Sequence, residues 1–340
     1  MPTLLSNAMS IQTLLKCKGY DASFILPNTP VDIRKVLPAK YMKLLPQVKG
    51  NPEGILNYTN LSVLYNKERK LPFVSAYNID GSSKSTTVKR TSFRKDERLD
   101  DDLQLDNHFY DLKKDITEFE IGHMSANNEM AWGKQAQVQS YQTFHFPNSV
   151  PQAERLNTGI WKGLESYIIK ESAGQTNNNR ICVFTGPILK KNDPPYVLSP
   201  DFRIPLLFFK VIVFEYKNKL YSTAFIMSHE QKLIEDKLIV PKMKPLSRGA
   251  VSPEAVLAFN DYPYKKVFQV NIPTLETLSG LHFTWKGVNQ ISFPQEKNQI
   301  EKIKSIGSSD DLRGRGMADA ASRTLTPRKS IPATTLIMPG

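Results

Sequence analysis

The sequence predicts a single α/β domain of the α+β type, with a mixed, mainly antiparallel central sheet flanked by helices. Between about residues 56 and 290, short apolar runs of strand length recur and are separated by turn signals. Two longer stretches, 128–142 and 151–171, instead show helical periodicity. Apolar residues make up 40% of the 340 residues, which is enough for a sizeable core.

The chain divides by composition into three expected segments. Residues 1–50 form an N-terminal extension of uncertain structure, interrupted by prolines, with one short helix expected at 31–37. Residues 51–290 carry the patterned domain. Residues 291–340 are expected to be a flexible C-terminal tail, because a stretch rich in Gly, Ser, Arg, Thr and Pro cannot bury enough apolar surface to fold alone.

The strands follow from apolar runs bounded by polar turns. A first pair is expected at 61–65 and 71–79, with the second strand ending at the turn signal Asp80-Gly81. Residues 80–119 are then expected to form a long polar connecting segment. The remaining predicted strands are 180–185, 205–216, 219–227 and 267–270, followed by a short helix at 273–280.

Two local sequences fix how these elements end. Lys217-Asn218 joins 205–216 to 219–227 directly, so these two strands should form an antiparallel hairpin. Gly280 is placed as the C-terminal stop of the helix before it. In the stretch 151–171, Leu156, Ile160 and Leu164 recur at spacings of four and form an apolar stripe.

The charge of the chain favours an anionic partner. Lys and Arg exceed Asp and Glu by 12, as expected of a protein that binds nucleic acid or a lipid surface. Two cysteines cannot build a disulfide framework or a Cys-rich zinc site. Neither a membrane span nor a signal peptide is recognisable, so a cytoplasmic location is expected, with secretion by a signal-independent route left open.

His123 is the leading candidate catalytic residue. It follows Gly122, read here as a tight turn ahead of a polar helix start. A neutral imidazole can take a proton from water near pH 7, which suits a general base. The alternative is a satisfied core or surface histidine. His108, His145, His229 and His282 have no partners at zinc spacing and are read as structural.

Asn157 and Glu165 are candidate metal residues on the second helical stretch. An amide oxygen from Asn157 can ligate a magnesium ion, which keeps several of its waters. Glu165 lies eight positions on, about 80° around the same helix, where it could hold one of those waters. The alternatives are an ordinary helix-surface Asn and a solvent-facing Glu.

Four further side chains are candidates for binding or support. Arg90, with Arg94 as a fallback, could clamp a phosphate through two hydrogen bonds, although a solvated charge run is the alternative. Asn148 and Gln152 flank Pro151 before the expected helix, where they could support the His123 loop or contact phosphate. Their alternative role is simple capping of that helix.

Together these residues resemble the active-site core of the non-specific DNA/RNA endonucleases with a ββα-metal site. The resemblance begins with Glu120-Ile121-Gly122-His123 and continues through Asn148, Asn157 and Glu165. It extends to residues 58–80, 183–187, 204–213, 224–227 and 278–281, and so covers roughly residues 55–286. It implies a ββα unit at about 118–171 within an endonuclease domain.

The resemblance assigns a role to each matching position. It makes His123 the general base, Asn157 the metal-binding residue, Glu165 the acidic residue held through water, and Asn148 the loop amide. Arg90 is the match to the transition-state arginine. Where the family usually has Asp-Arg-Gly-His, Glu120 can replace Asp in orienting the site, but Ile121 cannot replace a guanidinium.

The resemblance implies Mg²⁺-dependent hydrolysis of phosphodiester bonds with little sequence specificity, Mn²⁺ being a substitute ion. DNA is the expected substrate and RNA a second one left open. An inhibitor or regulatory protein is an expected partner, a dimer is left open and no membrane partner is expected. The competing interpretation is a nucleic-acid-binding module of the same fold with weakened catalysis, which Ile121 favours.

Overall fold

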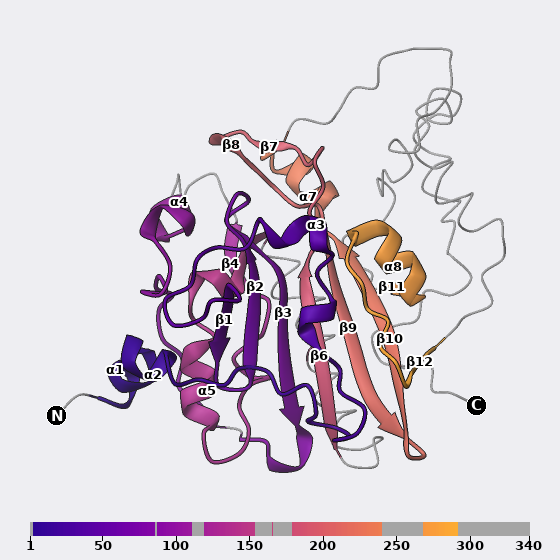
Figure 1. Cartoon of the computed structure of the whole chain (residues 1–340). Helices are drawn as coiled ribbons and strands as arrows, with labels where there is room; N and C mark the ends of the chain where they lie inside the picture. The colour runs from indigo at the N-terminus through magenta and orange to yellow at the C-terminus, as the bar shows by residue number, and fades with distance from the viewer. Residues whose placement is uncertain are drawn as a thin grey trace, which may run out of the picture.

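The computed structural model describes residues 3–85, 87–110, 119–153, 165, 179–239 and 268–291. Its centre is an eight-stranded sheet of order β1-β2-β3-β6-β9-β10-β11, with β12 also paired to β10 (Figure 1). All pairings are antiparallel except that of β12, which runs parallel to β10. The strands are β1 Ile55–Tyr58, β2 Leu61–Asn66, β3 Leu71–Asp80, β6 Arg180–Pro187, β9 Leu207–Tyr216, β10 Lys219–Ser228, β11 Phe268–Val270 and β12 Val288–Gln290. The mainly antiparallel α+β fold is therefore confirmed.

The turns form where the sequence places them. Lys217 and Asn218 both have positive φ, 50° and 60°, which is the conformation of a two-residue hairpin turn that matches strand twist. Asp80 ends β3 by accepting a hydrogen bond from the Ser82 amide at 3.0 Å, which starts the 3-10 turn η2 Gly81–Ser83. The predicted hairpin and the predicted end of β3 are both confirmed.

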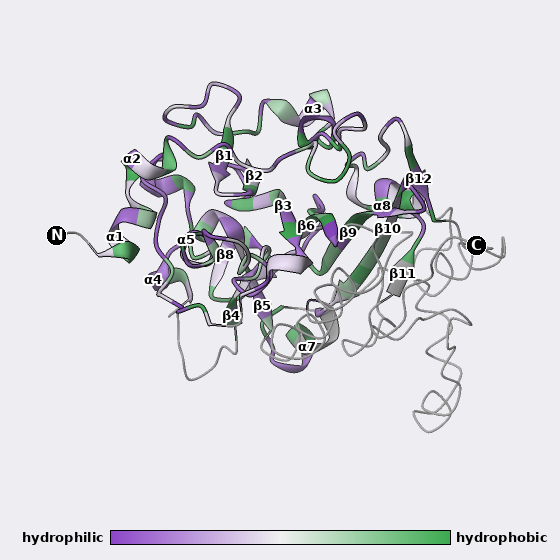
Figure 2. Cartoon of the chain, turned by 90° about the horizontal axis from the view of Figure 1, so that it is seen from below, coloured by the Kyte–Doolittle hydropathy of each residue, from purple (hydrophilic) through white to green (hydrophobic). Residues whose placement is uncertain are grey.

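One face of the sheet is covered by the N-terminal segment and by α8 Ile272–Ser279 (Figure 2). The N-terminal part contributes η1 Ile33–Lys35 and α3 Ala39–Met42, and Val36 and Leu37 are buried there. Gly280 caps α8 in the left-handed conformation, at φ 69°, as its place in the sequence predicts.

The opposite face carries a separate two-stranded sheet, β4 Phe119–His123 and β5 Ser149–Ala153 (Figure 2). Around it lie α4 Asn107–Tyr110, α5 Ala136–Gln142, η4 Phe146–Asn148 and α7 Glu230–Glu235, together with η3 Asp101–Leu103, β7 Pro195–Tyr196 and β8 Ser199–Arg203. The apolar cluster between this layer and the central sheet includes Phe119, Met124 and Val150.

Two predicted helical boundaries are wrong. The stretch 128–142 is helical only from Ala136, because Gly133 adopts a positive φ of 66° and the preceding residues form turns. Residues 151–153 belong to β5 rather than to a helix, since Pro151 pairs opposite Ile121 across β4. The rest of the predicted 151–171 helix, apart from Glu165, lies outside the described residues, as does the tail beyond residue 291.

Among the residues that the structure describes, no helix is both long and apolar enough to cross a membrane.

Candidate active site

His123 ends β4 and pairs opposite Ser149 of β5. Gly122, just before it, is a strand residue and not the tight turn that the sequence suggests. A glycine is needed for a different reason, because a Cβ at this position would lie 2.0 Å from the Gln152 amide oxygen. The Gln152 side chain therefore crosses β4 directly over the backbone that carries the histidine.

The His123 ring is enclosed by aromatic side chains. Its centroid lies 4.5 Å from that of Phe93 and 4.6 Å from that of Phe144, and the residue is 8% exposed. Its Nε2 atom is buried and has no hydrogen-bond partner among the described residues. Burial, and after it the positive charge of Arg90, lowers the pKa of His123 to about 3. The imidazole is therefore neutral at pH 7.

Arg90 is brought to the histidine by the same aromatic wall. Its guanidinium carbon lies 5.7 Å from the centroid of the Phe144 ring. The Arg90 side chain is otherwise exposed. Arg94 is also exposed, but the contacts the structure gives it are made by its backbone, which pairs with 144–146. Of the two arginines, Arg90 is thus the one whose charge acts on His123.

Asn148 is built into the fold beneath the site. Its side-chain oxygen accepts hydrogen bonds from the Ser75 hydroxyl at 2.9 Å and the Ser125 amide at 3.0 Å. Its side-chain nitrogen donates to the carbonyls of Ser125 and Thr143, both at 3.0 Å. These four bonds tie the turn after His123 to the end of α5 and to β3.

Gln152 and Glu120 face each other across the β4–β5 pair. Gln152 is fully buried, and neither polar atom of its amide has a hydrogen-bond partner among the described residues. Glu120 is half-buried and keeps its own polar contacts. A buried amide without a hydrogen bond is costly in free energy.

Glu165 is the described member of the predicted metal pair, and Asn157 lies outside the described residues. The Glu165 side chain is 15% exposed, and its Oε1 lies 3.9 Å from the Lys210 ammonium. In the part of the chain that the structure describes, no three His, Cys, Asp or Glu side chains group as metal ligands would. An amide and a carboxylate completed by waters are a donor set that magnesium accepts.

A buried polar cluster beside Glu165 was missed by reasoning from sequence. Lys210 and Glu129 are both 0% exposed, and their nearest charged atoms lie 3.1 Å apart. Tyr77 completes the cluster, with its hydroxyl 2.6 Å from the Glu129 carboxylate. One signal was present in the sequence, since Lys210 interrupts the apolar run Leu-Phe-Phe-Lys-Val-Ile-Val-Phe. A buried strand lysine needs an anionic partner.

The N-terminal helices α1 Leu4–Met9 and α2 Ile11–Leu14 lie beside α5 (Figure 1). Met9 belongs to a small apolar cluster with Tyr141 and Phe144. The Phe144 ring is also one of the aromatic rings that enclose His123. Segment 1–50 therefore reaches the site through Phe144.

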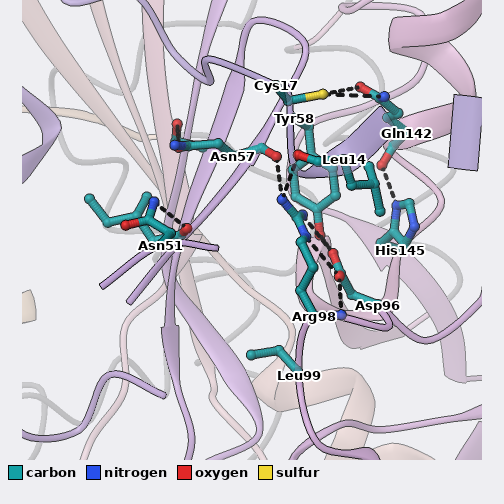
Figure 3. A network of polar contacts seen from close by, with 12 residues as sticks. Leu14, Cys17, Asn51, Asn57, Tyr58, Asp96, Arg98, Leu99, Gln142 and His145 are labelled. Atoms are coloured by element: carbon teal, nitrogen blue, oxygen red, sulfur yellow. Dashed lines mark hydrogen bonds and ion pairs between the residues drawn. The ribbon is translucent and has the colours of Figure 1, made fainter. Parts of the chain in front are cut away.

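Polar contacts hold this N-terminal segment in place (Figure 3). The Arg98 guanidinium donates to the Leu14 carbonyl at 3.2 Å and pairs with Asp96 at 2.7 Å. The Gln142 amide donates to the Ala8 carbonyl at 3.0 Å. Asp96 and Arg98 are both buried, and the Arg98 hydrogen bonds help keep the pKa of the Asp96 carboxyl at about 2, so the pair stays charged.

The other buried histidines are held by the fold. In His229, Nδ1 accepts from the Ala153 amide at 3.2 Å, so Nε2 is the nitrogen that donates to the Pro205 carbonyl at 2.8 Å. His145 bonds the Gln142 carbonyl through Nδ1 at 3.0 Å (Figure 3). Both contacts agree with the structural role expected from sequence.

The mainly antiparallel sheet thus carries a separate strand pair that presents a neutral histidine beside an arginine. Residues 45–290 match the family of DNA/RNA non-specific endonucleases, and the chain belongs to this family. It is accordingly a hydrolase that acts on nucleic acids. The match begins after α3 and ends with β12, so α1 and α2 lie outside it.

A solved structure has the same fold. It is the crystal structure of the EndoG/EndoGI complex, whose matching chain is 20% identical in sequence, with a TM-score of 0.50. The alignment covers 75% of this chain and 96% of that one. No curated protein matches the sequence closely.

Proposed function

We propose that this chain is a Mg²⁺-dependent endonuclease that hydrolyses phosphodiester bonds of DNA, and of RNA as a second substrate, with His123 as the general base. The observation that carries the proposal is the state of His123, which is neutral and buried and has Nε2 unbonded among the described residues. A base must begin the reaction without its proton, and this environment holds the imidazole in that form.

Substrate binding is expected to strengthen this base. The positive charge of Arg90 is one cause of the low pKa of His123. A phosphodiester placed beside Arg90 adds negative charge, which offsets that cation and raises the affinity of the imidazole for a proton. His123 would then accept a proton from the attacking water only once the phosphate is in place.

Arg90 would bind the phosphate and stabilise the charge that builds up on it in the transition state. Its exposed guanidinium leaves it accessible to a large substrate, and its contact with Phe144 keeps it near His123. Arg94 serves as a second backbone contact and Glu120 as an acceptor that orients the strand pair. Such contacts address phosphate and not base edges, so weak sequence preference follows.

Asn157 and Glu165 would hold the metal ion, Asn157 directly and Glu165 through a water. When bound, the ion would stabilise negative charge on the phosphate and on the leaving oxygen. Magnesium suits this donor set, and Mn²⁺ is expected to substitute because it also accepts oxygen ligands. Asn148 supports the loop from below, while Gln152 offers its buried amide to the site.

The second candidate function is a nucleic-acid-binding module of this fold with weakened catalysis. Ile121 favours it, because its side chain is half-buried against the main apolar cluster and supplies no charge where the family usually has an arginine. The two proposals differ in one result, since both bind nucleic acid and only the nuclease cuts it.

We also propose a protein inhibitor as a partner. The EndoG structure was solved as a complex that explains EndoG inhibition. A nuclease with weak sequence preference needs such control wherever it meets the nucleic acid of its own cell. The cytoplasm as its location and a dimer as its assembly are further expectations from the sequence.

A supercoiled-plasmid assay tests the proposed function. We expect Mg²⁺ to convert the plasmid to open and then linear forms, excess EDTA to stop this, and the cut ends to carry 5′-phosphates. Asn157→Ala should require more Mg²⁺ for half-maximal cleavage and reach a lower maximum, whereas Asn107→Ala, an exposed asparagine in α4, should behave as wild type. Tight DNA binding without any cleavage would favour the binding module instead.

A further inference from the structure

Lys210 is a lysine in the middle of a central strand, with no exposed surface. Its ammonium donates to the Tyr77 hydroxyl at 2.8 Å and contacts both carboxylate oxygens of Glu129 at 3.1 Å. A buried lysine of this kind is stable only with an anionic partner, which Glu129 supplies. The pair alone would be electrically neutral.

A second carboxylate also faces this ammonium. Glu165 Oε1 lies 3.9 Å from Lys210 Nζ, within ion-pair distance. The Lys210 ammonium thus contacts both Glu129, which is completely buried, and Glu165, which is 15% exposed. A cation within ion-pair distance of both carboxylates offsets the repulsion between their two negative charges.

Glu129 connects this cluster to the loop of the histidine. Its Oε2 accepts hydrogen bonds from the Tyr77 hydroxyl at 2.6 Å and from the Ala126 amide at 3.2 Å. Ala126 lies three residues after His123. Burial and the Glu129 carboxylate raise the pKa of Tyr77 well above its usual value, so its hydroxyl keeps the proton that it donates.

The central sheet is therefore connected to both the turn after His123 and Glu165 through one side chain, that of Lys210. β9 supplies Lys210 and β3 supplies Tyr77, and both are inner strands of the eight-stranded sheet. From Lys210, one contact leads through Glu129 to the turn after His123, and another leads to Glu165.

We propose that Lys210 is a positioning residue for the hydrolysis, and that its ammonium holds the Glu165 carboxylate in a fixed position relative to the His123 loop. This inference rests on the proposed function, in which Glu165 holds a metal-bound water and His123 acts as the base. Lys210 is fully buried and acts through Glu165. It sets where Glu165 can place its oxygen relative to the water that His123 activates.

The test must separate this role from a purely structural one. Lys210→Met alone would leave two carboxylates without their cation, so we combine it with Glu129→Gln. Together the two substitutions remove one positive and one negative charge. The matched single variant Glu129→Gln keeps Lys210 beside Glu165. As a control, Arg69→Met with Asp193→Asn removes another partly buried ion pair, of 2.8 Å.

The measurements are the melting temperature, its rise with added Mg²⁺, and the kcat and KM for a DNA duplex. We expect the Lys210→Met/Glu129→Gln protein to fold, to need about tenfold more Mg²⁺ for half of the melting-temperature rise, and to lose about tenfold in kcat with KM little changed. Glu129→Gln weakens one contact of Lys210 but keeps its ammonium beside Glu165, so its losses in Mg²⁺ response and kcat should be smaller than those of the double variant, whereas the Arg69/Asp193 control should keep both. A folded double variant with wild-type Mg²⁺ response and kcat would overturn the proposal.

Two further variants, Glu165→Gln and Tyr77→Phe, separate a failure of the proposed role of Glu165 from a failure of the proposed role of Lys210. If Glu165→Gln leaves the Mg²⁺ response unchanged, the role of Glu165 in the proposed function fails. If Glu165→Gln shifts the response and the double variant does not, only the role of Lys210 fails. Should the double variant not fold, Tyr77→Phe removes one bond of Lys210 and no charge, and an unchanged kcat and Mg²⁺ response in that folded protein would contradict the proposal.

Discussion

The rings of His123 and Phe144 meet edge to face, with centroids 4.6 Å apart and an angle of 89° between their planes. Phe144 also lies under the Arg90 guanidinium and packs with Met9 of α1. A single aromatic side chain thus joins the proposed base, the proposed phosphate-binding arginine and an N-terminal helix outside the family match. The N-terminal extension should therefore influence a reaction that it does not touch.

Met9→Ala tests this influence of the N-terminal extension. Met9 is buried, so truncation should lower the free energy of unfolding by about 2 kcal/mol or more. It should also reduce cleavage of plasmid DNA in the fraction that remains folded, because Phe144 loses part of its support. Leu4→Ala on the same helix, where the leucine is 54% exposed, is the matched control and should change neither quantity. Normal cleavage by folded Met9→Ala protein would show that the packing of α1 does not influence the reaction.

Asn148→Ala should destabilise the protein strongly. The substitution leaves the Ser75 hydroxyl, the Ser125 amide and two carbonyls in a buried site without their partner. We expect a loss of about 2 to 4 kcal/mol in the free energy of unfolding, measured by urea denaturation. A loss below about 0.5 kcal/mol would mean that water replaces the amide there and that the four bonds are not what secures the turn.

The pKa of His123 can be measured by NMR titration of its ring protons. We expect a midpoint far below the ordinary 6.5, near the value of about 3 that burial and then Arg90 impose. Because this pKa is lowered in the folded state, the unfolded chain takes up the proton first as pH falls. His123 thus contributes to stability above pH 6.5, and this contribution is lost as pH falls toward about 3. A midpoint near 6.5 in the folded protein would mean that the ring is hydrated.

Ile121→Arg tests whether this position lacks only a phosphate contact. The half-buried side chain packs against the main cluster, where the stem of an arginine can follow the same path and extend its guanidinium to solvent. We expect cleavage to increase, most at low salt, where an added cation attracts the nucleic-acid backbone most strongly. Lower or unchanged cleavage by the folded variant would show that Ile121 contributes through packing.

The positions of β2, β3, β6, β9, β10 and β11 could be predicted from the sequence because each of these strands is a local pattern of apolar residues, whereas the short strands β1, β7, β8 and β12 were not predicted. The β9–β10 hairpin needs only two apolar runs and the Lys217-Asn218 turn between them, and these are visible without any tertiary contact. Gly280 likewise ends α8 through its own backbone preference. The position of β5 was not predictable in this way, since Pro151 marks a helix start as well as a strand facing Ile121.

The candidate site could be predicted only in part. His123 was found from its place after Gly122, but the reason for that glycine is the Gln152 side chain crossing from β5, a contact that sequence does not reveal. The Lys210–Glu129 pair joins residues 81 positions apart, so neither residue indicates the other. Its effect on the site depends on the distance to Glu165, which only the folded chain provides.

The identity of the base is the central claim, and cleavage of plasmid DNA by purified His123→Ala protein tests it most directly. His108→Ala, which removes an exposed histidine, is the control and should cut as wild type does. With Mg²⁺ present, we expect His123→Ala to fold and bind DNA but to cut at less than about a hundredth of the wild-type rate. A folded His123→Ala protein that cuts at more than about a tenth of that rate would contradict the account, because another group would then be activating the water.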